Sequence, residues 1–147
     1  MDKLKNADNL KGKTIDELEV GQSASFTKTV TEVDVYDYLG ISGDFNPVHT
    51  NEEYAKGTMF KTRIAHGMIS AGFISTVLGM RLPGPGTIYL SQDLKFTHPV
   101  YFGDTITATC TIEDIQVEKN RVTLDTVCTN QRGETVVEGK ALVLAPE

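Results

Sequence analysis

An aspartate and a histidine five residues apart are the first candidates for chemistry in this sequence. They are Asp44 and His49, within the segment SGDFNPVH at residues 42–49. On a continuous α-helix, side chains five positions apart point about 140° away from each other. Gly43 tolerates backbone angles that other residues resist, while Pro47 fixes its own φ and disfavours helical backbone just before it. The segment therefore predicts a helix break that lets a carboxylate and an imidazole converge for acid–base chemistry.

The same segment also suits a simple turn without any chemistry. Asp, Asn, Gly and Pro are the usual residues of turns, and His49 would then be an ordinary buried or surface imidazole. Taken alone, the segment favours the turn. The surrounding elements must decide between the two interpretations.

Size and composition predict one globular domain over residues 1–147, with residues 1–12 expected as a flexible tail. The chain has 39% hydrophobic and 23% charged residues, which is ordinary for a soluble protein. Its net charge of -6 and its lack of a Lys/Arg cluster argue against nucleic-acid binding. There is no signal-like apolar run and no stretch long enough to span a bilayer. We therefore expect a cytoplasmic protein without a membrane or nucleic-acid partner.

The cysteines and histidines do not predict a metal site. Cys110 and Cys128 are the two cysteines, no CxxC pair occurs, and no His cluster has ligand spacing. A hairpin centred on residues 118–120 would place the two cysteines opposite each other, and we expect reduced thiols in the core. A phosphate loop and a GxGxxG motif are both missing, so no nucleotide cofactor is predicted.

Two kinds of hydrophobic pattern follow each other along the chain. After a strand at 22–30, Thr31 and Asp34 have capping-box spacing and open a short helix to about Leu39. Thr50 or Asn51 can cap a second short helix. Residues 66–82 carry no charge between their first residue and Arg81, so this helix must be buried nearly all round.

Beyond the Pro-Gly turn at 83–86 the hydrophobic period changes from helical to two. This predicts a long strand at 88–97 with one apolar face, and then strands at 105–112, 122–128 and 134–144. The apolar face of the first of these strands comprises Ile88, Leu90, Leu94 and Phe96. The predicted class is α+β, with one antiparallel β-sheet wrapped around the long apolar helix and its other face wet.

The start of the apolar helix is a second candidate for chemistry. If the helix begins at His66, the amides of Gly67 and Met68 lack partners within the helix and carry partial positive charge. Such amides can bind an oxyanion, and Gly67 would let a carbonyl oxygen approach closely. The alternative is a loop-to-helix junction that binds no ligand, and the helix start alone does not distinguish the two.

Three runs together carry a family resemblance that covers most of the chain. They are Gly43-Asp44-Phe45-Asn46-Pro47-Val48-His49, Ala65-His66-Gly67-Met68 and Gly86-Thr87-Ile88-Tyr89-Leu90. With them the chain resembles the MaoC-like (R)-specific enoyl-CoA hydratases, whose fold is the hot dog. The resemblance implies that Asp44 and His49 activate a water that adds to a trans-2-enoyl-CoA, giving a (3R)-3-hydroxyacyl-CoA, with dehydration as the reverse. The Gly67 amide would then stabilise the enolate oxygen.

The resemblance also implies roles for further residues. Asn46 would pin the catalytic loop, His66 and Met68 would contact the substrate, and Ser75 would lie near the reacting centre. Leu78 and Val143 would limit the acyl chain, with Phe73 as a further candidate wall, and a short substrate near crotonyl-CoA is expected. Lys95, Arg63 and Arg81 are candidate cations for CoA phosphates. Coenzyme A arrives with the substrate, so no other cofactor is expected, and two chains would pair as a homodimer or a higher homo-oligomer.

Three other functions remain open from the sequence. A (3R)-hydroxyacyl-ACP dehydratase would use the same two groups but would need a basic docking patch, and no such patch is evident. A thioesterase of the same fold would direct water at the carbonyl carbon. A non-enzymatic acyl-CoA binding module would predict loss of Asp44 or His49, and both are present.

Overall fold

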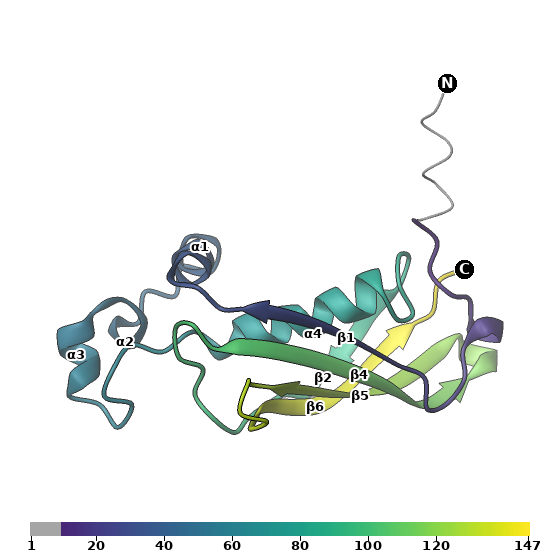
Figure 1. Ribbon diagram of the computed structural model, residues 1–147. Helices are drawn as coiled ribbons and strands as arrows, with labels where there is room; N and C mark the ends of the chain where they lie inside the picture. The colour runs from purple at the N-terminus through teal and green to yellow at the C-terminus, as the bar shows by residue number, and fades with distance from the viewer. Residues whose placement is uncertain (1–9) are drawn as a thin grey trace.

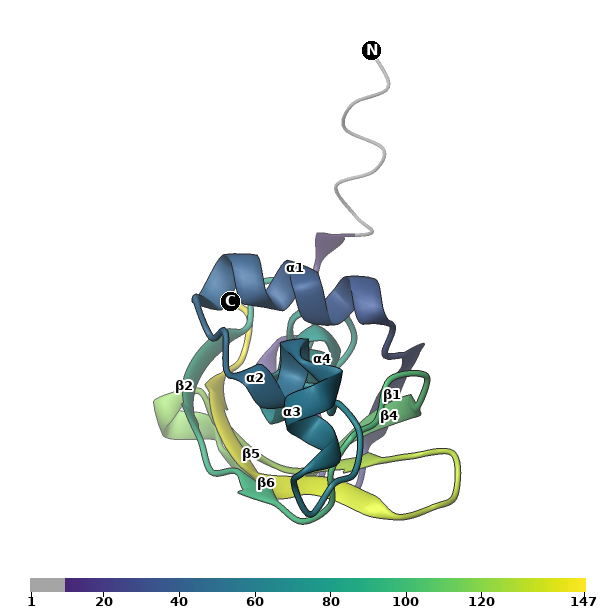
Figure 2. The same ribbon diagram turned by 90° about the vertical axis from the view of Figure 1, so that its left-hand side faces the viewer.

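A computed structural model describes residues 10–147 of the chain (Figure 1). Its six strands form one antiparallel sheet in the order β1-β4-β5-β6-β2, with the short β3 also paired to β6. Seen from the end, the sheet curves around helix α4 (Figure 2). The predicted α+β arrangement is therefore confirmed. The elements are η2 (Ile15–Glu17), β1 (Ser23–Thr29), α1 (Glu32–Ser42), α2 (Pro47–Thr50), α3 (Glu52–Lys56), α4 (Gly67–Met80), β2 (Ile88–Gln92), β3 (Lys95–Phe96), β4 (Thr105–Gln116), η3 (Val117–Lys119), β5 (Arg121–Thr129) and β6 (Thr135–Leu144).

The core lies between the inner face of the sheet and one side of α4. Alternate residues of β4 and β5 are fully buried, which is the burial pattern expected of a sheet with one wet face. Ile74 and Leu78 of α4 pack into the same cluster. On the outer face, threonine hydroxyls pair across the strands, as between Thr27 and Thr107 at 2.8 Å. In β4 and β5, both predicted faces of the sheet are confirmed.

The apolar stretch at 88–97 differs from the prediction of one long strand. It is split into β2 and β3, and β2 contains a bulge between Tyr89 and Ser91. The backbone at Asp93 crosses so close to β6 that a Cβ at Gly139 would lie 1.9 Å from the Asp93 carbonyl oxygen. This crossing interrupts the strand.

The predicted burial of this apolar face is also wrong within a single chain. Ile88 is 57% exposed and Leu90 is 43% exposed, because β2 is an edge strand paired only with β6. The prediction that α4 is buried nearly all round needs the same correction, since Met68 and Met80 are exposed. One side of α4 and the neighbouring edge strand are thus left uncovered.

The two cysteines lie diagonally across β4 and β5 and do not face each other directly as predicted. Cys110 pairs with Thr126 and Cys128 with Ala108. The hairpin is centred between residues 118 and 119, where Gln116 pairs with Arg121, and a bulge in β4 just after Ile112 shifts the register by one further residue. Both thiols are free and buried, and burial raises the pKa of each to about 12. They are core thiols without nucleophilic character.

The first described residues are attached to the body of the fold. The Gly12 amide donates to the Pro85 carbonyl at 2.9 Å, and the Lys13 amide donates to the Pro83 carbonyl at 2.8 Å. Gly12 of the expected tail therefore lies against the Pro-Gly turn, and residues 1–9 of the tail lie outside the described residues. Across residues 10–147, no helix is long and apolar enough to cross a membrane.

The segment between β1 and α4 carries α1, α2 and α3 and sits at one end of the sheet (Figure 1). Thr31 caps α1 through the capping box predicted with Asp34, and Asn51 caps α3. Arg63 ties the segment together, because its guanidinium pairs with Glu32 at 3.0 Å and with Glu52 at 3.4 Å. The short helices thus form a braced unit beside the N-terminus of α4.

Candidate active site

The connection between α1 and α2 is the helix break that the sequence predicts. Helix α1 ends at Gly43, which has φ 75° and donates its amide to the Leu39 carbonyl. The Ser42 hydroxyl accepts the Asp44 amide at 3.1 Å. The Asn46 side chain then accepts the amide of Val48 at 3.2 Å and caps α2. The two caps turn the chain sharply. The hydrogen bond from the Val48 amide to Asn46 is the contact through which Asn46 would anchor the loop.

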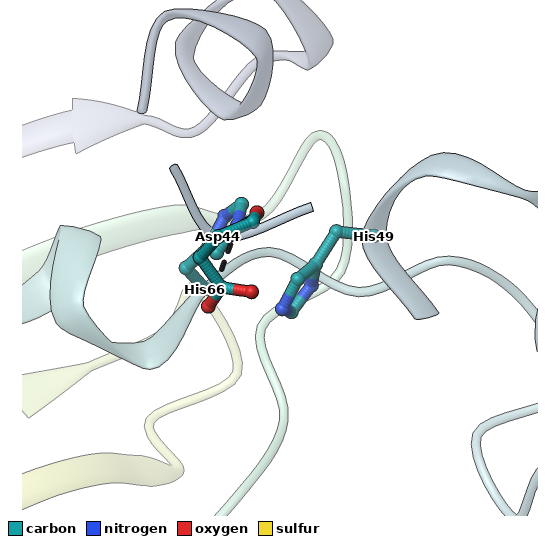
Figure 3. Close-up of side chains that lie close together, drawn as sticks. All are labelled: Asp44, His49 and His66. Atoms are coloured by element: carbon teal, nitrogen blue, oxygen red, sulfur yellow. Dashed lines mark hydrogen bonds and ion pairs between the residues drawn. The ribbon is translucent and has the colours of Figure 1, made fainter. Parts of the chain in front are cut away.

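This turn brings Asp44 and His49 together with a third side chain, His66. One ligand-type atom of each of the three lies within 4.8 Å of those of the other two. Figure 3 shows the His49 ring reaching from α2 toward Asp44 and His66. The Asp44 carboxylate is half-exposed, whereas His49 is only 7% exposed. A solvated base and a desolvated base therefore share one site.

The hydrogen bonds of His49 fix its tautomer. Its Nδ1 lies 2.6 Å from the Ile64 carbonyl oxygen, and a carbonyl can only accept, so Nδ1–H is the donor. In the neutral ring, Nε2 then carries the lone pair. Burial lowers the pKa of His49, and the nearby His66 lowers it further, against opposing contributions from the Ile64 hydrogen bond and the Asp44 charge. His49 is thus held neutral with a proton-accepting nitrogen.

The pKa direction sets an expected pH profile. Because protonation of Nε2 removes the acceptor, activity should fall as the pH drops through the pKa of His49. That pKa lies below the ordinary value of 6.5, so the acid limb of kcat/KM should have its midpoint below pH 6.5. A rate profile between pH 4.5 and 9 measures it. An acid limb centred at or above 6.5 would contradict the tautomer and charge assigned to His49.

A cavity of about 480 Å³ opens beside these groups. Its polar end holds Asp44, His49 and His66, and Gly67 and Met68 at the start of α4 also line it. The structure therefore brings together the three predicted catalytic residues and two of the predicted substrate contacts. The remaining walls are mostly apolar and are formed by Met59, Phe60, Ile64, Ala65, Phe96, Thr97, His98, Pro99, Val100, Val136 and Val137.

Gly67 is the first residue of α4 and lies directly under an aromatic ring. A Cβ built at this position would be 2.6 Å from Cδ1 of Phe96. The first amides of a helix have no partner inside the helix and carry partial positive charge. The missing side chain therefore leaves room both for the Phe96 ring and for a ligand oxygen at the helix start.

Replacing Gly67 by alanine should cost activity without unfolding the chain. The added methyl group must displace the half-exposed Phe96 ring, which lines the cavity, so kcat/KM for an enoyl-CoA should fall about tenfold or more. Initial rates and thermal unfolding of the variant measure the two effects. Gly40→Ala is the matched control, because the Cβ meets open space in helix α1. Equal rates for the two variants would show that Gly67 has no function in the reaction.

The other residues implied by the resemblance lie further from this cavity. Ser75 is exposed on α4, whereas Leu78 and Val143 are fully buried in the core, and none of the three lines the cavity. Phe73 packs edge-to-face on Phe26 with ring centroids 5.5 Å apart. Their contacts with substrate stay predictions.

The three candidate cations differ in the ion pairs and hydrogen bonds that they already form. Arg63 is held by its two carboxylates and lies over the Phe102 ring, and Arg81 hydrogen-bonds the Ser25 carbonyl. Lys95 on β3 is exposed and forms no ion pair with any residue in the described range. It is therefore the most available of the three for a phosphate.

The sequence patterns missed much of the cavity wall. Met59 and Phe60 come from the stretch between α3 and α4, where no periodicity marks an inward side chain. Phe96 ends β3, the second part of the interrupted strand, and His98 follows it. Tyr38, whose ring centroid is 4.6 Å from that of His66, was part of a helix without a predicted partner.

The three grouped side chains are also of metal-ligating types. However, His49 Nδ1 donates to Ile64 and His66 Nε2 lies 3.0 Å from the Asp44 carbonyl oxygen, to which it donates. The readily available ligand atoms are then the Asp44 carboxylate and His49 Nε2. This is fewer than the three protein ligands usual in a catalytic zinc site. The donor set thus fits acid–base chemistry better than metal binding.

Comparison with known proteins defines the class. Residues 16–133 match the MaoC like domain, and the chain belongs to that family. It is 55% identical over 141 residues to an (R)-specific enoyl-CoA hydratase of Rhodospirillum rubrum, covering 96% of this chain and 97% of that protein. It is 42% identical over 132 residues to a 3-hydroxybutyryl-CoA dehydratase of Methylorubrum extorquens, covering 90% and 83%.

A solved structure agrees with the fold. An R-hydratase from Pseudomonas aeruginosa, in its unliganded form, superposes with a TM-score of 0.87 at 46% identity, covering 92% of this chain and 87% of that one. The family resemblance and the hot dog fold predicted from the sequence are both confirmed.

Proposed function

We propose that this chain is an (R)-specific enoyl-CoA hydratase, a hydro-lyase that interconverts trans-2-enoyl-CoA and (3R)-3-hydroxyacyl-CoA. The observation that carries the proposal is the placement of Asp44 and neutral His49 on either side of one cavity end, beside the first amides of α4. The two relatives, an (R)-specific enoyl-CoA hydratase and a 3-hydroxybutyryl-CoA dehydratase, are named for the same reaction in its two directions.

A water held between the two bases provides the nucleophile. It can donate one hydrogen bond to the Asp44 carboxylate and one to His49 Nε2. As its oxygen bonds to C3 of the substrate, Asp44 takes its proton while His49 keeps the water oriented. The pair returns one proton to C2, so H and OH are added across the double bond and both bases end in their starting state.

The start of α4 supplies the electrophilic half of the site. Attack at C3 moves electrons onto the thioester oxygen as an enolate forms. We infer that the Gly67 amide, the first of α4, donates to that oxygen, a contribution of about 3 kcal/mol for one such donor. No step needs a redox change, because the thioester already activates the double bond.

Hydration of crotonyl-CoA tests the proposal and separates it from the alternatives. Loss of the conjugated-enoyl absorbance is expected, and coupling to stereospecific dehydrogenases should identify the (3R) product. Release of free CoA thiol would mean a thioesterase. Faster turnover of crotonyl-ACP than of crotonyl-CoA would mean an ACP dehydratase, whose acidic carrier a chain of net charge -6 is poorly suited to attract.

The preferred acyl chain is proposed to be short. The four-carbon substrate in the name of the 42% identical relative supports this. A panel of enoyl-CoA substrates from four to twelve carbons should give the highest kcat/KM at four. The family resemblance assigns the limit on chain length to Leu78 and Val143, so Leu78→Ala and Val143→Ala should each shift the optimum to longer chains.

The working form is proposed to be a homodimer or a higher homo-oligomer. Exposed Ile88 and Leu90 on the edge strand β2, together with Met68 on α4, make an apolar face that a second copy would cover. Light scattering at micromolar concentration should give at least twice the chain mass. Leu90→Lys should shift the protein toward monomer, and a monomeric parent protein would refute the pairing.

The cell compartment and the need for a cofactor are also part of the proposed function. The enzyme is proposed to work in the cytoplasm, where its two buried free thiols match a reducing compartment. It is also proposed to need no metal or redox cofactor, with coenzyme A arriving only as part of the substrate. Full activity after dialysis against a chelator is the expected result.

A further inference from the structure

His66 is the most enclosed polar side chain of the site. It is 3% exposed and lies between two rings, with its centroid 4.6 Å from that of Tyr38 and 3.7 Å from that of His49. The planes of the two imidazoles are inclined by only 31°, so His66 covers one face of the His49 ring. It also occupies the N-cap position of α4, but its side chain forms no hydrogen bond to the helix.

The hydrogen bonding of His66 is directed at the main chain of Asp44. Its Nε2 lies 3.0 Å from the Asp44 carbonyl oxygen and 3.9 Å from the nearer carboxylate oxygen. Since a carbonyl only accepts, Nε2–H is the donor, and the bond is to the backbone and not to the reacting carboxylate. The dashed contact in Figure 3 joins these two residues.

The other ring nitrogen of His66 has no group or solvent with which it can exchange a proton. Nδ1 is buried and has no hydrogen-bond partner among the described residues. A group that passes protons needs a second partner or solvent at its other end. His66 therefore has the surroundings of a rigid support and lacks those of a proton carrier.

We propose that His66 is a positioning residue, which fixes the Asp44 main chain through Nε2–H and the plane of the His49 ring through stacking. The inference rests on the proposed hydratase function and differs from the substrate contact that the family resemblance implied. His66 acts through its two neighbours and not on the substrate itself.

Both neighbours need such a support. Asp44 sits in the turn between α1 and α2, where its amide is held by the Ser42 hydroxyl and its carbonyl by His66. With both peptide groups held, the direction of the carboxylate is set. The His49 ring is pinned at Nδ1 by Ile64, but rotation about Cβ–Cγ of a histidine is soft, and the stacked ring restricts it.

Two substitutions separate the two functions of the side chain. His66→Phe keeps a ring against His49 and removes the donor, whereas His66→Gln places an amide donor near the Nε2 position and removes the ring. If the bond to Asp44 is what positions the base, His66→Phe should lower kcat for crotonyl-CoA about tenfold with KM changed less than about twofold. His66→Gln keeps a donor to Asp44, so its kcat should fall less than that of His66→Phe and stay within about threefold of the parent enzyme.

The pH profile gives a readout that a purely structural role would not move. The titratable side chains grouped with His49 are Asp44, which raises its pKa, and His66, which lowers it; His98 lines the same cavity. Removing the His66 imidazole in His66→Gln should therefore move the acid limb of kcat to higher pH. An NMR titration of His49 in the same variant should show the same upward direction.

The outcomes are distinguishable from failure of the proposed function. A parent enzyme without activity on crotonyl-CoA overturns the function, and the NMR titration then still tests the contact between the two histidines. An active parent with both variants at parental kcat overturns the positioning function. Equal losses in both variants, with an unshifted His49 titration, would show general damage to the fold and overturn it as well.

Discussion

Replacing Asp44 by asparagine is expected to lower kcat for crotonyl-CoA hydration by about 10²–10⁴-fold, the usual contribution of a positioned acid–base group. The substitution preserves the shape of the side chain, and an amide oxygen can still accept the Asn46 amide as the Asp44 carboxylate does at 3.1 Å. It removes the negative charge and the basic oxygen that takes the proton of water. Stopped-time assays at pH 7 and thermal unfolding measure rate and fold separately.

Asp37→Asn is the matched control for this experiment. Asp37 is an exposed aspartate on helix α1, and its replacement removes one negative charge without touching the cavity. It should retain the parental rate. Asp44→Asn with more than half of the parental kcat would show that the carboxylate is not the base, and it would leave His49 as the only acceptor in the pair.

Replacing His49 by asparagine is expected to have an effect of similar size, about 10²–10⁴-fold on kcat. The Asn side chain places an N–H near the position of Nδ1, so the bond to the Ile64 carbonyl at 2.6 Å can be kept. The nitrogen that faces the water, Nε2, is lost. The variant thus separates the chemical function of the ring from its structural anchoring.

The comparison with His49→Ala sharpens this result. Alanine removes both the anchor and the acceptor, so it should lower stability as well as activity, because the Ile64 carbonyl then loses its partner. His49→Asn should be as stable as the parent protein and nearly as inactive as His49→Ala. An active, stable His49→Asn would contradict the assignment of Nε2 as the acceptor.

The fold was predictable wherever local pattern and packing agree. The alternation in β4 and β5 marks one buried face, and the uncharged run of α4 marks a helix that needs a sheet around it. Gly43 and Pro47 predicted the break in the chain from backbone restrictions alone, since no long-range contact is needed to forbid a helix there.

The remaining features depend on contacts that a local pattern does not contain. Ile88 and Leu90 look like core residues, yet β2 has a partner on one side only, so their burial depends on what lies beyond the chain. The bulge in β4 changes which residue faces Cys110 without any marker in the sequence. The stacking of His66 on His49 joins two segments whose meeting depends on the whole fold.

The two ion pairs of Arg63 have a consequence for how the protein loses activity. Its guanidinium joins the beginning of α1 to α3 through Glu32 and Glu52, while most strand pairing lies elsewhere, among β4, β5 and β6. Ionic strength weakens such charge pairs more than it weakens apolar packing. High salt should therefore inactivate the enzyme by loosening its helical end before the sheet, and activity should return on dilution while the sheet stays paired.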